Sequence, residues 1–327
     1  MASHRVRGAP ILHNERVTAP SSARITGWGT ALPEKVVTNA DLESSLDTSD
    51  EWIVERTGIR ERRIGGTTTG LGIEAARQAM ARAEVTGDDI DLVVLCTSTP
   101  DEAMPASASV IQQELGVTGG AVDLNAACSG FVYGLVAADG FLRAGLRRVL
   151  LIGSETMSRI VDWDDRGTAI LFGDGAGAIV LERGDGPGRV LGFDLGSDGS
   201  LRHILHAEVG GTIEMDGPEV FRRAVRVMVN SAKAALSSAG VTVEDLALFV
   251  PHQANARIID SACARLGIDA AHTVNILPTT GNTSAASIPM ALAAAADAGR
   301  LAPGDLVLVI GFGAGMSWAS AVIEWAR

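Results

Sequence analysis

The feature of this chain that most constrains its fold is an internal repeat. Residues 75–97 read AARQAMARAEVTGDDIDLVVLCT, and residues 229–253 read VNSAKAALSSAGVTVEDLALFVPHQ. Each segment passes from an Ala-rich helical pattern through a V-T-x-x-D turn into a short apolar run, and the two align at a constant offset of 156 residues. A repeat at a fixed spacing indicates that one structural unit occurs twice.

A second pair of segments repeats a longer order of elements. Residues 122–153 predict a strand, a turn, a long helix and another strand, and residues 274–311 predict the same four elements. Ala-rich helices resemble one another by chance, but a matched order of elements favours a duplication.

The duplication predicts how the chain is divided into domains. We expect two homologous halves, joined near the glycine-rich stretch at 184–188 and preceded by a loose extension that lacks the apolar core of a secretory leader. The expected segments are the extension at 1–22, the N-terminal half at 23–186 and the C-terminal half at 187–327.

Apolar runs mark the strands of each half. They are nearly continuous, which is typical of strands in α/β layers, where helices cover both faces of the sheet. Residues 219–239 place apolar side chains every three or four positions, as an amphipathic helix does. The expected strands are 92–96, 149–152, 246–250, 306–310 and 318–325.

Charge and cysteine content exclude several classes of protein. A net charge of −12 argues against bulk attraction to nucleic acid or to an anionic membrane. Three cysteines without metal-ligand spacing indicate a reduced, intracellular protein without a metal site. No apolar run approaches the length of about 18 residues that a membrane span needs. We therefore expect a soluble, cytoplasmic protein.

Cys128 is a candidate nucleophile. It lies in DLNAACSGFVYG, after an apolar strand and at the start of a long predicted helix, where the helix dipole and free N–H groups favour the thiolate. The alternative is a buried structural cysteine, which is the commoner fate of a free cysteine. Cys96, inside a strand, and Cys263, inside a helical pattern, fit that alternative.

His252 and Asn282 are two further candidates. His252 follows the strand at 246–250, and Asn282 lies in TTGNTSAAS, between a predicted strand and a helix. Singly, each has an ordinary explanation, as a polar surface histidine and as an asparagine that caps a helix. Together with Cys128, however, they all occupy strand-to-helix turns, where α/β folds place functional residues. We therefore expect the three side chains to meet at one face.

Six longer motifs identify the family that this chain resembles. They run from about residue 24 to the C-terminus and are long enough to be specific. The motifs are TSDEWIVERTGIRERRI (48–64), DLNAACSGF (123–131), DRGTAILFGDGAGAIVL (165–181), VPHQANARII (250–259), GNTSAAS (281–287) and GFGAGMSW (311–318). With these motifs the chain resembles the thiolase superfamily and, within it, the β-ketoacyl-acyl-carrier-protein synthase III family.

The resemblance implies a fold and a reaction. The fold is a five-layer αβαβα arrangement of two duplicated halves, assembled as a homodimer. The reaction is the decarboxylating Claisen condensation of a short acyl-CoA with malonyl-acyl carrier protein. It gives 3-ketoacyl-acyl carrier protein, CoA and CO2, and it initiates fatty-acid or polyketide synthesis. The implied catalytic residues are Cys128, which carries the acyl group, His252 and Asn282.

These residue types suit that chemistry. A cysteine thiolate is a natural nucleophile for thioester exchange. Decarboxylation of a malonyl group produces an enolate, whose charge the two neutral donors, His252 and Asn282, can stabilise. By analogy with the family, the backbone N–H groups of Cys128 and Ala314 form the oxyanion hole, and Phe312 gives the leaving carboxylate an apolar wall.

Coenzyme A enters as a thioester substrate, and no resident cofactor is implied. Trp52 and Arg166 match positions that hold the adenine ring between them, and Arg56 matches a position near the phosphates. Gly217 and Asn255 match positions along the pantetheine channel. The ordinary alternatives are a core aromatic for Trp52 and a surface cation for Arg166.

Two glycine clusters, GDGAG at 173–177 and GFGAG at 311–315, suggest a dinucleotide site at first sight. A dinucleotide fingerprint needs a helix after the glycines, whereas both clusters precede strand-like residues. We therefore expect tight turns between strands, and neither a nicotinamide nor a flavin.

The carrier protein is acidic, so an acidic chain needs a local basic patch to bind it. Family position supports Arg222, Arg257 and Arg265, against the alternative of a solvated helix face. Met104 matches an acyl-pocket position that is contributed across the dimer and is often Phe, and the stretch at 199–215 is shorter than many lids. Both departures predict primers longer or more branched than acetyl.

Two other functions remain open at this point. A non-condensing acyltransferase of a natural-product pathway often alters the His/Asn pair, and an inactive dimeric acyl-binding homologue would lose catalytic residues. The chain keeps Cys128, His252 and Asn282, which favours the condensing enzyme.

Overall fold

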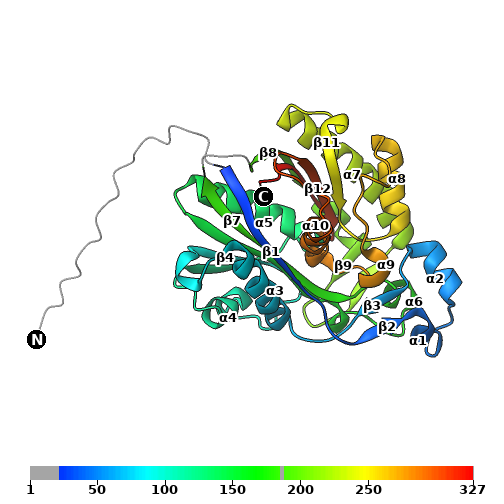
Figure 1. The fold of residues 1–327 in the computed structure, drawn as a ribbon. Coiled ribbons are helices and arrows are strands. Elements are labelled where there is room, and N and C mark those ends of the chain that lie inside the picture. The colour runs from blue at the N-terminus through cyan, green and yellow to red at the C-terminus, as the bar shows by residue number, and fades with distance from the viewer. Residues whose placement is uncertain (1–21, 185–187, 327) are drawn as a thin grey trace, which may run out of the picture.

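The structure is a computed structural model that describes residues 22–184 and 188–326 (Figure 1). The expected extension at 1–22 therefore lies outside the described residues except for Ser22, and so does the middle of the junction expected at 184–188. The described chain forms two main sheets, two small ones, and helices between and around them.

Five strands form the first main sheet. In order across the sheet they are β1 (Ser22–Ala31), β7 (Asp174–Gly184), β6 (Arg148–Thr156), β4 (Leu92–Cys96) and β5 (Gly120–Leu124). The β4 strand runs parallel to its neighbours β5 and β6, whereas β7 runs antiparallel to β6 and to β1. The β5 strand is left at one edge of the sheet.

Four strands form the second main sheet. In order they are β11 (Leu246–Pro251), β12 (Leu306–Gly313), β13 (Ser317–Glu324) and β8 (Val190–Ser197). A parallel pair, β11 and β12, is followed by two antiparallel pairs. The order β4, β6, β7, β1 in the first sheet has the same directions, strand for strand. All five strands expected from apolar runs are present in the two sheets.

Helices lie between the sheets and on both outer faces, which gives five layers (Figure 1). The middle layer holds α5 (Gly130–Arg143) and α10 (Ser287–Asp297), whose apolar side chains join those of both sheets in one buried cluster. The expected αβαβα architecture is confirmed. The outer helices are α3 (Thr68–Ala83) and α4 (Ser107–Glu114) on the first sheet, and α7 (Gly217–Ala239) and α8 (Ala256–Leu266) on the second.

Within the described residues, no helix is both long and apolar enough to cross a membrane.

Shorter elements close one end of the molecule. The shorter elements are β2 (Val36–Thr38), α1 (Asn39–Glu43), α2 (Asp50–Thr57), β3 (Glu61–Arg63), α6 (Arg166–Ala169), β9 (Leu205–Ala207), β10 (Ile213–Met215), α9 (Leu277–Thr280), and the 3₁₀ turns η2 (Ala127–Ser129), η4 (Gly199–Ile204) and η6 (Ser284–Ala286).

The strand expected to begin near Val274 is reduced to a single bridge between Thr273 and Phe249. The side chain of Gln253 accounts for the difference. Its Nε2 donates to the Val274 carbonyl at 3.2 Å, and its Oε1 accepts the Ile276 N–H at 2.8 Å, so a neighbouring strand cannot use these groups. The chain then turns into α9, with a proline in its first turn.

The glycine cluster at 173–177 is not the expected turn, because β7 runs through it. Gly177 lets α10 pack against this strand, since a Cβ atom there would lie 2.7 Å from the Met290 backbone nitrogen. In the cluster at 311–315, β12 continues through Gly313, and the expected turn follows it.

Candidate active site

A cavity of about 550 Å³ reaches Cys128, His252 and Asn282, so the three expected catalytic residues meet in one place. All three side chains are buried, with 9%, 1% and 7% of the residue surface exposed. Other expected site residues also line the cavity: Trp52, Arg56, Gly217, Arg222, Asn255, Arg257 and Phe312.

Cys128 lies in the tight turn η2, directly before α5. The preceding residue, Ala127, adopts a left-handed φ of 49°, which is strained for a residue with a side chain. Gly313 of β12 lies against this turn, where a Cβ atom would come 2.6 Å from the Cys128 backbone nitrogen. The glycine therefore allows the second sheet to support the nucleophile of the first half.

Burial keeps the Cys128 thiol neutral. It raises the pKa of Cys128 to about 12, and the nearby Glu155 carboxylate acts in the same direction. The start of a helix stabilises a thiolate by up to about 2 kcal/mol, and this stabilisation lowers the pKa of the thiol by about 1.5. The thiolate expected from the helix start is therefore not the resting form, because the effect of burial is larger.

His252 is a neutral hydrogen-bond donor. Burial lowers the pKa of His252 to about 3, so the ring is uncharged at neutral pH. Its Nδ1 lies 2.6 Å from the Ser287 Oγ, and this oxygen also accepts the Gln253 N–H at 3.3 Å. Because the Ser287 oxygen already accepts one N–H, we assign the hydroxyl proton to Nδ1, which leaves the proton of the ring on Nε2.

Asn282 is a second neutral donor. Its Oδ1 accepts the Ser284 N–H at 2.9 Å, so its NH2 group is the part available to a substrate oxygen. Its backbone N–H donates to the Leu171 carbonyl and its carbonyl accepts the Gly173 N–H, which fixes the residue from a neighbouring segment. A nucleophile and two uncharged donors thus share one cavity, as stabilisation of a developing oxyanion requires.

Sequence reasoning missed the supporting roles of Ser284 and Ser287. Both lie in the motif GNTSAAS, at 281–287, from which only Asn282 was singled out. The spacing of two and five residues after Asn282 was visible in the sequence, but the partners of the two hydroxyl groups come from β6 and from the turn after β11.

A second, smaller cavity of about 190 Å³ also reaches Cys128. Ala314, expected in the oxyanion hole, lines it together with Ser284 and the strands β9 and β10 of the expected lid. Phe312 lies on the other cavity, 3% exposed, with its ring edge-on to His252 at a centroid distance of 5.6 Å.

The two arginines expected around coenzyme A stack on Trp52. The guanidinium carbons of Arg56 and Arg166 lie 4.8 and 4.7 Å from the centre of the Trp52 ring. Arg166 also donates to the Asp47 carbonyl at 2.7 Å. To hold a ring between them, the Trp52 indole and the Arg166 guanidinium need a separation of about 7 Å, which is two stacking distances. The expected adenine sandwich therefore forms only if Arg166 moves away from the indole.

Gly217 and Asn255 lie on the cavity wall, where the pantetheine channel was expected. Gly217 is the first residue of α7. The Asn255 Oδ1 caps α8 by accepting the Arg257 N–H at 2.9 Å, and its Nδ2 donates to the Arg56 carbonyl at 3.0 Å. Asn255 therefore also joins α8 to α2, and one N–H of its amide remains for a ligand.

Two of the three expected docking arginines line the cavity and are exposed. Arg222 pairs with Glu219, and the Arg257 guanidinium lies 5.5 Å from the centre of the Phe221 ring. Arg265 is exposed as well, but it lies about two turns further along α8 and does not line the cavity.

Met104 does not line the cavity of its own chain. It is 83% exposed, on the loop between β4 and α4. A part in an acyl pocket therefore requires a second copy of the chain.

Two family models match this chain. The model described as 3-oxoacyl-[acyl-carrier-protein] synthase III matches residues 122–199, and the model of its C-terminal part matches residues 236–325. Among curated proteins, the β-ketoacyl-[acyl-carrier-protein] synthase III of Rhizobium johnstonii is 49% identical over 92% of this chain and 98% of its own length. The protein of the same name from Brucella melitensis biotype 2 is 49% identical with the same coverage.

Solved structures are similar as well. The 3-oxoacyl-[acyl-carrier-protein] synthase III of Aquifex aeolicus VF5 matches with a TM-score of 0.92 and 42% identity, over 93% of this chain and 100% of that one. The priming β-ketosynthase of the R1128 polyketide pathway matches with a TM-score of 0.90 and 38% identity, over 96% of this chain and 99% of that one.

The neutral state of Cys128 predicts how it reacts with iodoacetamide. Because its pKa is raised to about 12, the thiolate fraction increases about tenfold for each unit of pH. We expect the alkylation rate, followed by mass spectrometry of the mapped peptides, to rise throughout the range from about pH 7 to pH 9. Cys96, fully buried in β4, serves as the unreactive internal control. A rate at Cys128 that levels off near pH 7 would show a resting thiolate and contradict the neutral thiol.

Proposed function

The chain belongs to the β-ketoacyl-[acyl-carrier-protein] synthase III family, and we propose that its reaction runs through an acyl group carried on Cys128. It is a condensing acyltransferase, and it catalyses the initiating condensation of fatty-acid synthesis. The observation that carries the proposed mechanism is the meeting of one nucleophile and two neutral donors, Cys128, His252 and Asn282, in one buried cavity.

In the first half-reaction, the Cys128 sulfur attacks the thioester carbonyl of a short acyl-CoA. The new C–S bond forms on Cys128, the bond to the coenzyme sulfur breaks, and the thiol proton leaves with that sulfur as free CoA. Backbone N–H groups of Cys128 and Ala314 stabilise the tetrahedral oxyanion. The position of Ala314 on the smaller cavity, beside Cys128, supports this assignment.

In the second half-reaction, malonyl-acyl carrier protein loses CO2. The electron pair of the broken C–C bond forms an enolate, whose oxygen accepts hydrogen bonds from His252 Nε2–H and from the Asn282 amide. The enolate carbon then attacks the acyl group, and the Cys128 thiolate leaves and takes up a proton from solvent to restore the thiol. Both donors are uncharged, and the buried Phe312 provides an apolar wall, so the leaving carboxylate is poorly solvated where it reacts.

The outer part of the cavity would bind the coenzyme and then the carrier. Trp52 and Arg166 would hold the adenine after Arg166 swings out, Arg56 would contact phosphates, and Gly217 and Asn255 would line the pantetheine arm. Guanidinium groups suit this task because they both stack on flat rings and bind phosphate oxygens.

The homodimer and the cytoplasmic location are further parts of the proposal. The exposed side chain of Met104 and the edge strand β5 support a contact with a second copy, in which Met104 of the partner subunit would close the acyl pocket. The three cysteines are free, as in a reducing compartment.

The two half-reactions should respond differently to Asn282→Ala. We expect malonyl decarboxylation to fall about 100- to 1,000-fold, because one donor to the enolate is lost. Acylation of Cys128 should persist, because its oxyanion uses backbone donors. Release of labelled CO2 measures malonyl decarboxylation, and intact-protein mass spectrometry with acyl-CoA measures acylation of Cys128.

Cys128→Ser is the matched control and should show no acyl adduct. An adduct that maps to Cys96 or Cys263 would refute the assignment of the nucleophile. Equal losses in both half-reactions of Asn282→Ala would refute the separate roles of the side-chain and backbone donors.

Charge reversal tests the docking arginines. We expect Arg222→Glu, Arg257→Glu and Arg265→Glu to raise the KM for malonyl-acyl carrier protein and to weaken its salt dependence, because an acidic partner loses opposite charges. Transfer from acyl-CoA should change much less. Lys233→Glu, an exposed position further along α7, is the control of equal charge change. If a double charge reversal left the kinetics with the carrier unchanged, these arginines would only form a solvated helix face and would not bind the carrier.

Primer choice tests Met104. Methionine is unbranched and adaptable, whereas phenylalanine is flat and rigid. We therefore expect tolerance of isobutyryl- and longer acyl-CoA, with a shift toward acetyl-CoA in Met104→Phe, read as ratios of kcat/KM in competition assays. A strict acetyl preference that Met104→Phe leaves unchanged would remove Met104 from the pocket.

A further inference from the structure

Glu155 is a buried carboxylate that the proposed mechanism does not use. It lies near the end of β6, with 0% of its surface exposed. Burial raises the pKa of Glu155, and hydrogen bonds from its neighbours act in the opposite direction. A carboxylate this deep needs an explanation, because burial without compensation is costly.

The loop that follows β4 supplies one set of donors to Glu155. Its carboxylate accepts the Ser98 N–H at 3.0 Å, the Thr97 hydroxyl at 3.1 Å and the Thr99 hydroxyl at 2.6 Å. The Thr99 hydroxyl oxygen in turn accepts the Thr156 N–H at 2.9 Å, so its own proton points to the carboxylate. Donors that cannot reverse direction favour the ionised form of Glu155.

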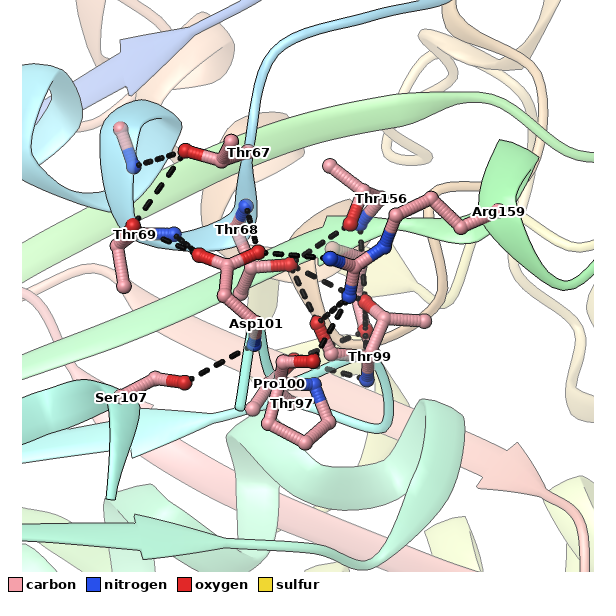
Figure 2. A network of polar contacts seen from close by, with 12 residues as sticks. Thr67, Thr68, Thr69, Thr97, Thr99, Pro100, Asp101, Ser107, Thr156 and Arg159 are labelled. Carbon is pink, nitrogen blue, oxygen red and sulfur yellow. Dashed lines mark hydrogen bonds and ion pairs between the residues drawn. The ribbon is translucent and has the colours of Figure 1, made fainter. Parts of the chain in front are cut away.

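A second set of contacts fixes the same loop, as Figure 2 shows. Arg159 donates to the Thr99 carbonyl at 2.6 Å and pairs with Asp101 at 2.8 Å. Asp101 also accepts the N–H groups of Thr68 and Thr69, at 3.1 and 2.7 Å, at the start of α3. These contacts hold the loop around Thr99 in place, and the Glu155 carboxylate is hydrogen-bonded to this fixed loop.

Ser284 connects Glu155 to the catalytic residues. Its hydroxyl donates to the Glu155 carboxylate at 2.9 Å, and its backbone N–H donates to the Asn282 Oδ1 at 2.9 Å. Ser284 has a left-handed φ of 48°, a conformation that persists only where surrounding contacts hold it. It also lines the smaller cavity together with Cys128. Glu155 therefore anchors the strained residue that orients the Asn282 amide.

We propose that Glu155 is a positioning residue for the condensation: through Ser284 it fixes the amide of Asn282, and it places a fixed negative charge near Cys128. This inference rests on the proposed function. It assigns two separable effects to one carboxylate. The hydrogen bond to Ser284 acts on the orientation of Asn282, and the charge acts on the thiol of Cys128.

The two effects have different signatures. Removing the charge of Glu155 lowers the pKa of Cys128, because the carboxylate raises it, so the thiolate becomes available at lower pH. The Ser284 hydroxyl has one proton, which it donates to Glu155, so removing this hydroxyl keeps the negative charge and should leave the pKa of Cys128 high. Both changes disturb Asn282, since both remove the Glu155–Ser284 hydrogen bond or weaken it. A general loss of structure would not lower the pKa of Cys128 in one variant and leave it high in the other.

The experiment compares Glu155→Gln and Ser284→Ala with the wild type. We expect labelled CO2 release from malonyl-acyl carrier protein to fall about 10- to 100-fold in both, by analogy with the cost of misplacing a catalytic group by about 1 Å. The pH profile of Cys128 alkylation should shift to lower pH in Glu155→Gln and stay close to that of the wild type in Ser284→Ala. Thermal unfolding of each variant checks that it folds.

Asp91→Asn is the matched control. Asp91 is a partly buried carboxylate that accepts the N–H groups of Arg147 and Arg148, at the opposite end of β6 from Glu155. Its variant should leave the alkylation profile and the ratio of the two half-reactions unchanged. If Glu155→Gln does not fold, Ser284→Ala decides the orientation effect, because it removes the hydrogen bond to Glu155 and keeps the backbone N–H that the Asn282 Oδ1 accepts.

Failure of this inference and failure of the proposed function look different. A wild type that shows neither an acyl adduct on Cys128 nor CO2 release would overturn the proposed function. A wild type that does both, with variants whose CO2 release is unchanged or with a Glu155→Gln alkylation profile that does not shift to lower pH, would overturn the role of Glu155.

Discussion

The active site depends on a close crossing of the two halves of the chain, which two glycines make possible. Gly153 in β6 lies under the turn η6 of the C-terminal half, where a Cβ atom would come 2.4 Å from the Ala285 carbonyl oxygen. Gly311 in β12 lies under the turn η2 of the N-terminal half, where a Cβ atom would come 2.9 Å from the Cys128 carbonyl oxygen. Each strand therefore has no side chain where the other half's catalytic turn crosses it.

This reciprocal crossing explains why the strained residues occur where they do. Ala127 precedes Cys128, and Ser284 follows Asn282 by two positions, and both adopt left-handed φ values. The middle helices α5 and α10 begin directly after these turns and are buried between the sheets. The buried helices hold the turns in place, and the turns project a nucleophile from one half and a donor from the other into one cavity.

Much of this could be predicted from the sequence. The repeat and the apolar runs predict two α/β halves, and the family resemblance implies their five layers. Strand-to-helix turns point to Cys128, His252 and Asn282, because their positions depend on local order. The strand expected near Val274 is absent because a side chain distant in sequence, Gln253, occupies its backbone groups. Local patterns do not contain that competition.

The protonation states could not be predicted in this way. The start of α5 favours a thiolate at Cys128, but burial is a property of the whole fold and outweighs the helix start. The same holds for the Ser287 hydroxyl, whose contact with His252 joins residues 35 positions apart, and for Glu155, whose contact with Ser284 spans 129 positions. Motifs locate reactive side chains, whereas tertiary contacts set their charge and direction.

The two ends of the cavity differ in a way that suits a reaction with two successive substrates. At the inner end, His252, Asn282 and Cys128 are buried and their neighbours are hydrogen-bonded, so little reorganisation accompanies the chemistry. At the mouth, exposed arginines lie over the rings of Trp52 and Phe221, and exposed cation–π contacts contribute only about 0.5–1 kcal/mol each. In the proposed reaction, weak, movable contacts there would let free CoA leave before the carrier-bound substrate enters through the same opening. A rigid mouth would retain the first product, and a mobile inner end would lose the alignment of the donors, so the proposed reaction needs both properties in one cavity.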